Sequence, residues 1–435
     1  MKRLLILLVL LMLLAAGAAA FVLFSSGTPP QIALAPTQGA VGPATEFQLT
    51  VSAPQNGLKR IVATVRQEQT SRPLVREVPA VKPGSYSTVF TLPADALQDG
   101  QVQVDVEAVD ASYSNMAEGA RATASFTFVL DKNPPILSVL SQQHNLNQGG
   151  SGLVMFTANE ELQLAEVRVG DRAFPAYKLP DGRFAGLFAF PYYVEKADFS
   201  PTLHVVDIAG NTTSRGFPFF ANARKFKRDT IRLPDSFLQR KMPEFSSQHP
   251  GITSPLDVFL KVNRETRHKN RQALLDIGSK SASIPLWSGS FLRLPNSATR
   301  AGFAEYRDYK HNGKTVDEQV HLGVDLASLK HAKVPAANNG VVVHANYLGI
   351  YGNCVIVDHG LGLMTLYAHL SSMEVAKGQQ VERGQILGRT GTSGMAGGDH
   401  LHYGVLAAGL PVNPLEWWDQ SWIENNISGK LRGEQ

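Results

Sequence analysis

The chain has 435 residues, more than one hydrophobic core usually organises, so we expect two to four domains. Its composition, with 43% hydrophobic and 18% charged residues, 38 glycines and 25 prolines, is typical of a turn-rich globular protein and excludes a largely disordered one. The net charge of +4 suits an anionic polymer or a membrane surface, although many proteins without such partners share it. The single cysteine, Cys354, excludes an intramolecular disulfide framework, and its apolar neighbours predict a buried structural thiol.

The N-terminal segment is strongly apolar. Lys2 and Arg3 precede an unbroken apolar run over residues 4–24, which is long enough to cross the ~30 Å hydrocarbon core of a bilayer. With the positive charges inside, residues 1–30 are predicted to anchor the chain in the cytoplasmic membrane. A cleaved signal peptide is the alternative, because residues 18–20 are alanines that suit a cleavage site. Both interpretations place the rest of the chain in the cell envelope, on the periplasmic or extracellular side.

Two β-rich blocks follow the apolar segment. Residues 31–132 and 133–222 contain short β-branched and aromatic runs separated by Pro, Gly and Asn turns, a spacing that predicts two β-sandwich modules. The end of the second block, residues 203–211, loosely repeats residues 106–115 of the first, and its tail at residues 207–211 resembles the end of bacterial immunoglobulin-like domains. We expect these modules to serve as spacers or to bind envelope proteins.

The sequence changes character at residues 223–285, where apolar side chains recur at helical spacing among Lys, Arg and Gln, which predicts a helical connector. The strand-and-turn pattern then returns and predicts a compact β domain over residues 286–421, with a tail at 422–435. The predicted fold class is therefore mainly β: an N-terminal transmembrane helix, two immunoglobulin-like β-sandwich modules, a helical connector and a C-terminal antiparallel β domain.

Three short motifs in the last domain carry the candidate chemistry. They are His321-Leu-Gly-Val-Asp325, Tyr367-Ala-His369-Leu and His400-Leu-His402. Zinc in catalytic sites usually takes three nitrogen or oxygen ligands and keeps a fourth position for water. His321, Asp325 and one member of the last pair meet that requirement.

Strand alternation predicts where two of these motifs point. Residues two apart in a strand project to the same face, so His400 and His402 should point the same way. By the same alternation, His369 should share a polar face of its strand with Thr365 and Tyr367. That face is the candidate functional face.

The first motif needs a bend before its two polar ends can meet. Four residues of extended strand would separate His321 from Asp325 by about 13 Å. Gly323 permits a bend. A helical turn would also bring the two residues together, but Gly323 and Val324 are poor helix residues.

Together, the three motifs resemble those of the lysostaphin-type (LytM-domain) zinc endopeptidases of bacterial cell walls, over roughly residues 286–420. The resemblance implies a small, mostly antiparallel β fold with Zn²⁺ in a groove. It assigns the metal ligands and the catalytic pair as follows: His321, Asp325 and His402 bind zinc, and His369 and His400 are catalytic.

Two features fall outside this resemblance. Ahead of the first ligand, Gly302-Phe303 is a variant of the family's lead-in sequence and Arg307 is displaced. The resemblance therefore does not assign the residues of the groove wall at this point, although it does assign the metal site. The other histidines of the domain lack a partner at ligand spacing, and we expect surface or turn positions for His311, His331, His344 and His359.

The implied function is the hydrolysis of peptide cross-links in peptidoglycan by zinc-activated water, with the two catalytic histidines transferring a proton or stabilising the oxyanion. The spacing does not say which histidine does which. The implied partners are peptidoglycan stem peptides or cross-bridges, and no nucleic acid. The main alternative is a non-enzymatic cell-wall scaffold or an activator of another wall hydrolase; a peptidase of protein substrates is a third. Retention of all five site residues favours an enzyme.

The segments upstream of the β domain have two candidate roles. They either hold the domain at a distance from the membrane, or one of them packs over the groove and supplies an Asn or Asp side chain to the fourth zinc position.

Overall fold

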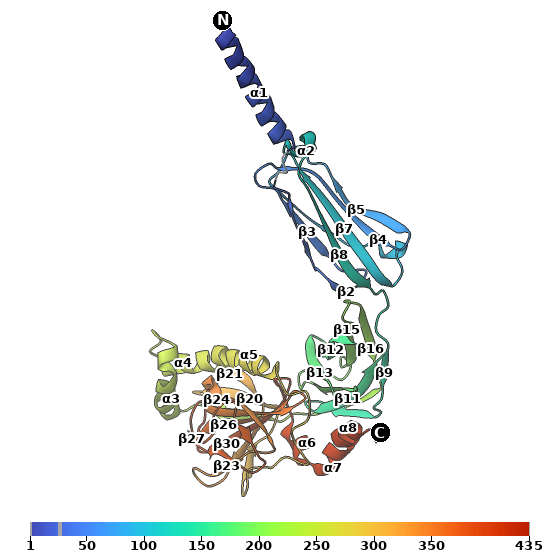
Figure 1. Cartoon of the computed structure of the whole chain (residues 1–435). Coiled ribbons are helices and arrows are strands. Elements are labelled where there is room, and N and C mark those ends of the chain that lie inside the picture. The colour runs from blue at the N-terminus through green and yellow to red at the C-terminus, as the bar shows by residue number, and fades with distance from the viewer. Residues whose placement is uncertain (1, 25–27, 435) are drawn as a thin grey trace. The chain divides into compact units, whose positions relative to one another are not determined.

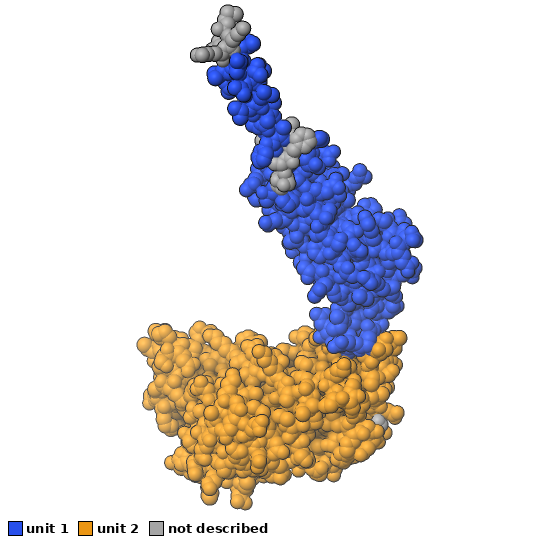
Figure 2. Space-filling view, viewed as in Figure 1, with its two compact units in different colours: residues 1–135, 160–163, 206–213 blue, residues 136–159, 164–205, 214–435 orange. Residues whose placement is uncertain are grey.

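The computed structural model describes residues 2–24 and 28–434, and the chain separates into two compact units, coloured separately in Figure 2. Unit 1 comprises residues 1–135, 160–163 and 206–213, and unit 2 comprises residues 136–159, 164–205 and 214–435. Strands dominate the described parts of the chain (Figure 1), so the mainly β fold class is confirmed.

The N-terminal segment forms helix α1 (Lys2–Phe24). No helix within residues 2–24 and 28–434 meets the length and hydropathy required of a membrane span. The transmembrane anchor, like the alternative signal peptide, stays a prediction.

Unit 1 contains two sheets around one hydrophobic core. The strands are β1 (Gln31–Ala35), β2 (Gly39–Val41), β3 (Phe47–Ser52), β4 (Leu58–Gln67), β5 (Thr70–Glu77), β6 (Ser85–Phe90), β7 (Gly100–Asp110) and β8 (Arg121–Leu130), with short helices η1 (Ala94–Ala96) and α2 (Ser114–Ala117). The sheets have the orders β1-β3-β6 and β2-β8-β7-β4-β5. Alternate residues of β3, beginning with Phe47 and Leu49, are buried in the shared core, as expected of a strand with one face inward. The immunoglobulin-like assignment itself stays a prediction.

The second β block follows in chain order. Its strands are β9 (Leu137–Val139), β10 (His144–Asn147), β11 (Ser151–Ala158), β12 (Leu162–Val169), β13 (Arg172–Lys178), β14 (Phe184–Ala189), β15 (Thr202–Asp207), β16 (Thr212–Gly216) and β17 (Phe219–Asn222). Seven of them form one sheet in the order β16-β15-β12-β13-β14-β11-β9, and β10 pairs in parallel with β17.

The segment predicted as a helical connector begins with a strand and continues as helices. Its elements are β18 (Arg228–Arg232), α3 (Asp235–Lys241), η2 (Met242–Gln248), α4 (Pro255–Lys261), η3 (Val262–Thr266) and α5 (Arg267–Gly278). Helix α4 begins where sequence rules place a helix start: the side chain of Ser254 accepts a hydrogen bond from the Asp257 amide, and Pro255 occupies the first turn.

The last domain is built on one antiparallel sheet. Its elements are β19 (Ala298–Ala301), β20 (Glu305–His311), β21 (Lys314–His321), β22 (Val324–Ala327), β23 (Lys333–Pro335), β24 (Gly340–Tyr347), η4 (Gly349–Tyr351), β25 (Asn353–Gly360), β26 (Leu363–Leu370), β27 (Ser372–Met373), β28 (Gln380–Val381), β29 (Ile386–Arg389), β30 (Leu401–Ala407) and β31 (Leu410–Val412), followed by α6 (Pro414–Trp418), α7 (Gln420–Ile423), η5 (Glu424–Ser428) and α8 (Gly429–Arg432). The main sheet has the order β19-β22-β30-β26-β25-β24-β28, with β31 paired to β30. Strand β18 pairs in parallel with β20, in a second sheet that also contains β21.

The connector helices cover one face of this sheet. In Figure 1, α3, α4 and α5 lie along the strands of the last domain. One hydrophobic core contains Phe259 of α4 and Leu274 of α5 together with Ile356, Leu366 and Leu406 of strands β25, β26 and β30. Cys354 is buried in the same core, which confirms the predicted structural thiol. The connector is therefore a structural layer of the last domain.

Candidate metal centre

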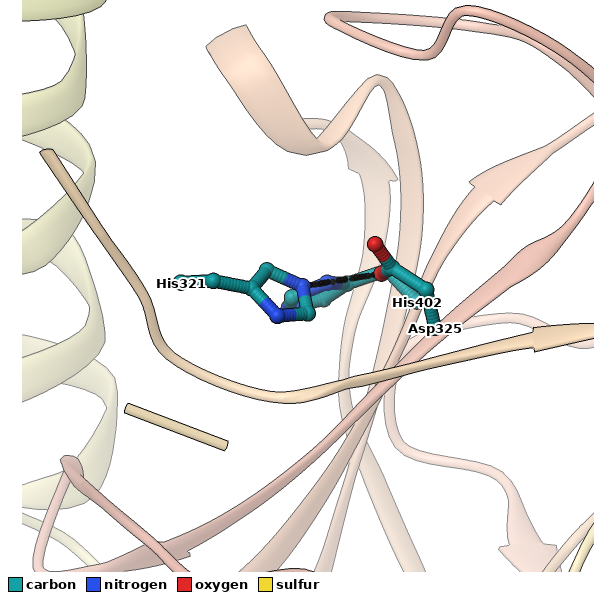
Figure 3. A group of neighbouring side chains, drawn as sticks. All are labelled: His321, Asp325 and His402. Atoms are coloured by element: carbon teal, nitrogen blue, oxygen red, sulfur yellow. Dashed lines mark hydrogen bonds and ion pairs between the residues drawn. The ribbon is translucent and has the colours of Figure 1, made fainter. Parts of the chain in front are cut away.

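The structure brings the three predicted ligands to one point, where Figure 3 shows their side chains directed at each other. Nε2 of His321 lies 2.9 Å from Oδ1 of Asp325 and 3.0 Å from Nδ1 of His402, and this Nδ1 lies 2.9 Å from the same Oδ1. Ligand atoms of a tetrahedral site with zinc bonds of ~2.0–2.2 Å lie about 3.3 Å apart. The triangle thus has nearly the size of one face of a zinc coordination shell.

Outer hydrogen bonds turn the lone pairs of these groups toward the centre. Nδ1–H of His321 donates to the carbonyl of Gly302 at 2.8 Å, which leaves Nε2 as the inward acceptor. Nη2 of Arg307 donates to Oδ2 of Asp325 at 3.1 Å, which leaves Oδ1 for the centre. Burial alone would raise the pKa of Asp325, but His321 and the other histidines hold it well below its ordinary value. Three converging donor atoms on a carboxylate and two imidazoles fit a divalent metal such as zinc, with a coordination position left over.

The first motif bends where it was predicted to bend. Strand β21 ends at His321 and β22 starts at Val324, with the chain turning at Gly323. A Cβ on Gly323 would lie 2.5 Å from Nε2 of His402 and 2.7 Å from the carbonyl of Tyr403. The glycine therefore serves a second purpose that the sequence did not reveal: it leaves room for the ring of the third ligand.

Strand pairing places His402 and orients His400. In β30, His402 pairs with Asp325 of β22 on one side and with Ala368 of β26 on the other. His400 immediately precedes β30, and its Nε2 lies 3.6 Å from the Oδ1 of Asp325 that His402 also approaches. The prediction that His400 and His402 point the same way is confirmed.

The alternation argument for His369 is wrong, although the residue does reach the site. Tyr367 pairs with Tyr403, whereas Ala368 pairs with His402, so simple alternation would turn His369 away from His402. Instead, the β25–β26 register shifts at this point, and His369 has a φ of 62°, which an L residue rarely adopts. This bulge brings the His369 ring to 4.9 Å from that of His400 and 5.8 Å from that of His402, between centroids.

The two candidate catalytic histidines have opposite electrostatic settings. Burial, followed by the neighbouring His400 and His402, holds the pKa of His369 well below its ordinary value, and its Nδ1–H donates to the carbonyl of Ser393 at 2.9 Å. Burial also lowers the pKa of His400, but the Asp325 carboxylate outweighs it and the net shift is upward. Neighbouring groups whose pKa values are pushed apart are suited to different proton-transfer roles.

A cavity of about 410 Å³ opens beside the ligands. Both candidate catalytic histidines and all three candidate ligands line it, together with residues that the sequence did not single out. Among these, Tyr351 has its ring centroid 5.6 Å from that of His402, and Arg267 and Arg271 come from helix α5. The sequence did contain a signal for these arginines: at helical spacing they lie on the same face of α5 as the buried Asn270 and Leu274. That spacing could have predicted that they face the domain.

The surface or turn position that we expected for His359 is wrong. His359 is fully buried inside β25, where Nδ1 contacts the carbonyl of Asn339 at 2.6 Å and Nε2 contacts the hydroxyl of Thr365 at 2.7 Å. It is a structural residue of the core and not a surface or turn residue. Burial lowers its pKa to about 4, so it stays neutral.

The connector approaches the site without entering the metal position. Within residues 2–24 and 28–434, the hydrogen-bond partners of the three ligand side chains come from the last domain alone, and they include no Asn or Asp of the connector. The predicted occlusion by such a side chain is therefore not seen; the connector forms a wall of the cavity.

Comparisons with known proteins place these observations in context. Residues 319–414 match the family described as Peptidase family M23. A 97-residue stretch is 40% identical to the DD-carboxypeptidase/endopeptidase Mpg of Neisseria meningitidis serogroup B and covers 22% of each protein. The murein hydrolase activator NlpD of Salmonella dublin is 31% identical over 131 residues, which cover 29% of this chain and 34% of NlpD. The matched segments thus span about a fifth to a third of these relatives.

A solved structure also matches. The catalytic domain of the antimicrobial peptidase lysostaphin from Staphylococcus simulans is 27% identical, with a TM-score of 0.26, over 30% of this chain and 98% of that domain.

Proposed function

Because this chain carries a peptidase family M23 domain of the lysostaphin (LytM) type, we propose that it is a zinc-dependent endopeptidase that hydrolyses peptide cross-links of bacterial peptidoglycan. The observation that carries the proposal is the convergence of His321, Asp325 and His402 within 3.0 Å of one another, beside a cavity that both catalytic histidines also line. A scaffold would not require this arrangement.

The side chains divide the work of hydrolysis. Zinc held by the triad would lower the pKa of a bound water to about 7, which supplies hydroxide at neutral pH. His369 is neutral, with Nδ1–H committed to Ser393, so its Nε2 can accept a proton. His400, whose protonated form Asp325 favours, can donate a hydrogen bond to the oxygen that becomes negative as the amide carbonyl is attacked. Arg307 holds the Asp325 carboxylate in place.

The second candidate function is activation of another wall hydrolase without catalysis. The murein hydrolase activator NlpD, which matches part of this chain, motivates it. Retention of all five residues, in the geometry described, favours hydrolysis instead.

Muropeptide analysis separates these two functions. Purified sacculi are incubated with the zinc-loaded full chain in detergent, and the released fragments are identified by mass spectrometry. We expect fragments with newly formed peptide termini, which are absent with the His369→Ala variant. If the zinc-loaded chain releases nothing but speeds up digestion by a second hydrolase, the activator function is correct.

The proposed location is the outer side of the cytoplasmic membrane, since the substrate lies outside the cytoplasm and residues 4–24 are an unbroken apolar run. N-terminal sequencing of the mature protein from the membrane fraction tests it. An intact N-terminus supports an anchor; loss of the apolar run supports a signal peptide. Recovery from the cytoplasm would contradict both.

A further inference from the structure

The cavity beside the metal centre is rich in positive charge. Five arginines line it, namely Arg232, Arg240, Arg267, Arg271 and Arg307. Among the residues that line it, Asp325 is the one carboxylate, and that group already serves the metal centre. A bound divalent metal would add further positive charge.

These arginines differ in the groups that pair with them. Arg307 is paired with Asp325 at 3.1 Å and with Glu305 at 3.5 Å. Arg267 donates to the side-chain and backbone oxygens of Asn263, at 2.6 Å and 3.2 Å, and these oxygens are neutral. Within residues 2–24 and 28–434, no Asp or Glu oxygen lies within 4.0 Å of a guanidinium nitrogen of Arg267 or Arg271. A half-buried guanidinium without an anion is costly, so an external anion would be stabilising here.

Helix α5 holds the two arginines in a fixed position. The side chain of Asn270, between them, accepts a hydrogen bond from the Ile350 amide at 2.9 Å, and a Cβ on Gly349 would lie 2.4 Å from that side chain. Leu274, one turn later, lies in the core shared with the sheet. The close packing fixes the backbone from which both arginines extend, so the helix does not need to be ordered when a ligand binds.

Tyr351 lies beside the metal centre and lines the same cavity as the two arginines. Its ring lies next to His402, and both Arg267 and Arg271 are near enough to lower the pKa of its hydroxyl, which burial nevertheless raises to about 12. Arg267, Arg271 and Tyr351 also line the same cavity as the three candidate metal ligands. A group bound by them would belong to the same substrate molecule as the bond being cleaved.

We propose that Arg267 and Arg271 form a carboxylate-binding subsite, so that the enzyme prefers peptides with a free carboxylate within one or two residues of the scissile bond. The planar guanidinium fork matches a carboxylate and binds it through two parallel hydrogen bonds. This subsite rests on the proposed function, since it acts on the substrate of the same site. The carboxylate is either the C-terminal α-carboxylate of a stem peptide or an acidic side chain.

The test measures binding apart from turnover. Three peptides are titrated by calorimetry into the zinc-loaded full chain carrying His369→Ala: acetyl-Lys-D-Ala-D-Ala, its C-terminal amide, and acetyl-Glu-D-Ala-D-Ala amide. We expect one or both carboxylate peptides to bind about 10-fold more tightly than the neutral-ended lysine amide. Preference for the first identifies the α-carboxylate, and preference for the third identifies the acidic side chain. Repeating the titrations after chelation excludes binding of the carboxylate to zinc.

Charge variants assign the preference to the two arginines. Arg267→Gln and Arg271→Gln should each abolish it, while the matched control Lys269→Gln, on the exposed side of α5, should retain it. Thermal unfolding verifies that each variant is folded, and Arg271→Gln is the decisive one, because Arg271 has no internal hydrogen bond in the described structure comparable to that of Arg267 with Asn263. Equal affinity for all three peptides, or a preference that survives in folded Arg271→Gln, overturns the subsite. Tight carboxylate binding by a chain that releases no muropeptides would instead contradict the hydrolytic function and leave the subsite intact.

Discussion

The cavity has two walls of different origin. Strands β21, β22, β26 and β30, with His400 just ahead of β30, contribute the candidate ligands and catalytic histidines, each in a short motif that can be recognised in the sequence. Strand β18 and helices α3 to α5 contribute arginines and apolar side chains from a segment with no recognisable motif. If the proposed function and subsite are correct, the two walls divide the labour: the sheet wall performs the chemistry, whereas the helical wall stabilises the sheet and selects the substrate.

Loss of a metal ligand should have the largest effect of any single change in the sheet wall. Asp325→Ala and His402→Ala each remove one of three ligands, so we expect zinc content to fall and hydrolysis to become undetectable. His369→Ala should keep its zinc while kcat falls ~10²–10⁴-fold, the usual contribution of a general acid or base. Metal analysis of dialysed protein and fragment release from sacculi measure the two quantities. Equal zinc loss in all three variants would refute the division between ligands and catalytic residues.

Gly323→Ala should weaken the same wall without removing a ligand. The added Cβ would lie 2.5 Å from the His402 ring, so that ring or the bend must move. We expect zinc affinity to drop ~10–100-fold, as when the groups that orient a ligand are changed. Gly216→Ala is the control, because a Cβ there meets nothing within 4 Å. Unchanged zinc affinity in Gly323→Ala would show that the bend tolerates a side chain.

Phe259→Ala tests the helical wall as a structural layer. Phe259 is fully buried in the core shared with β25, β26 and β30, so its truncation should lower the free energy of unfolding by ~3–5 kcal/mol. Gln272→Ala, at an exposed position of α5, should change it by less than ~0.5 kcal/mol. Urea unfolding followed by circular dichroism measures both. If Phe259→Ala unfolds like the wild type, the connector is an independent element that merely touches the domain.

Arg267→Gln should have the smallest of these effects and should be confined to substrate binding. We expect KM for a carboxylate-bearing wall peptide to rise about 10-fold while zinc content and kcat stay unchanged. Lys269→Gln should leave both constants as in the wild type. A fall in kcat with unchanged KM would instead place Arg267 among the groups that act in the transition state. The helical wall would then contribute to the chemistry as well as to substrate binding.

The sheet wall was largely predictable because its information is local. Two-residue spacing in an extended strand fixes the common direction of His400 and His402, and a glycine between two ligands fixes the bend at Gly323. The orientation of His369 was not predictable from alternation, because it depends on a bulge set by the register between β25 and β26. A single sequence does not reveal such a shift.

The helical wall was predictable as helix but not as part of the site. Apolar spacing indicates that α5 buries one face, yet it does not say against what. Arg267 and Arg271 were unremarkable in a basic segment, and their place beside the cavity depends on how α5 packs, with Asn270 against η4 and Leu274 in the shared core. His359 was misjudged for a related reason: an Asp-His-Gly sequence suits a turn, but the hydroxyl of Thr365 and the carbonyl of Asn339 satisfy the imidazole in the core.

The shared core of connector and sheet also has a consequence for the order in which the chain matures. During synthesis, α3 to α5 emerge before β25, β26 and β30, which cover their apolar face, so Phe259 and Leu274 stay exposed until roughly the last third of the chain has followed. The active-site cavity closes only when both halves meet. A nascent or truncated chain that ends before β30 therefore lacks both His402 and a finished cavity, so the proposed hydrolytic activity could not arise before translation of the domain is nearly complete.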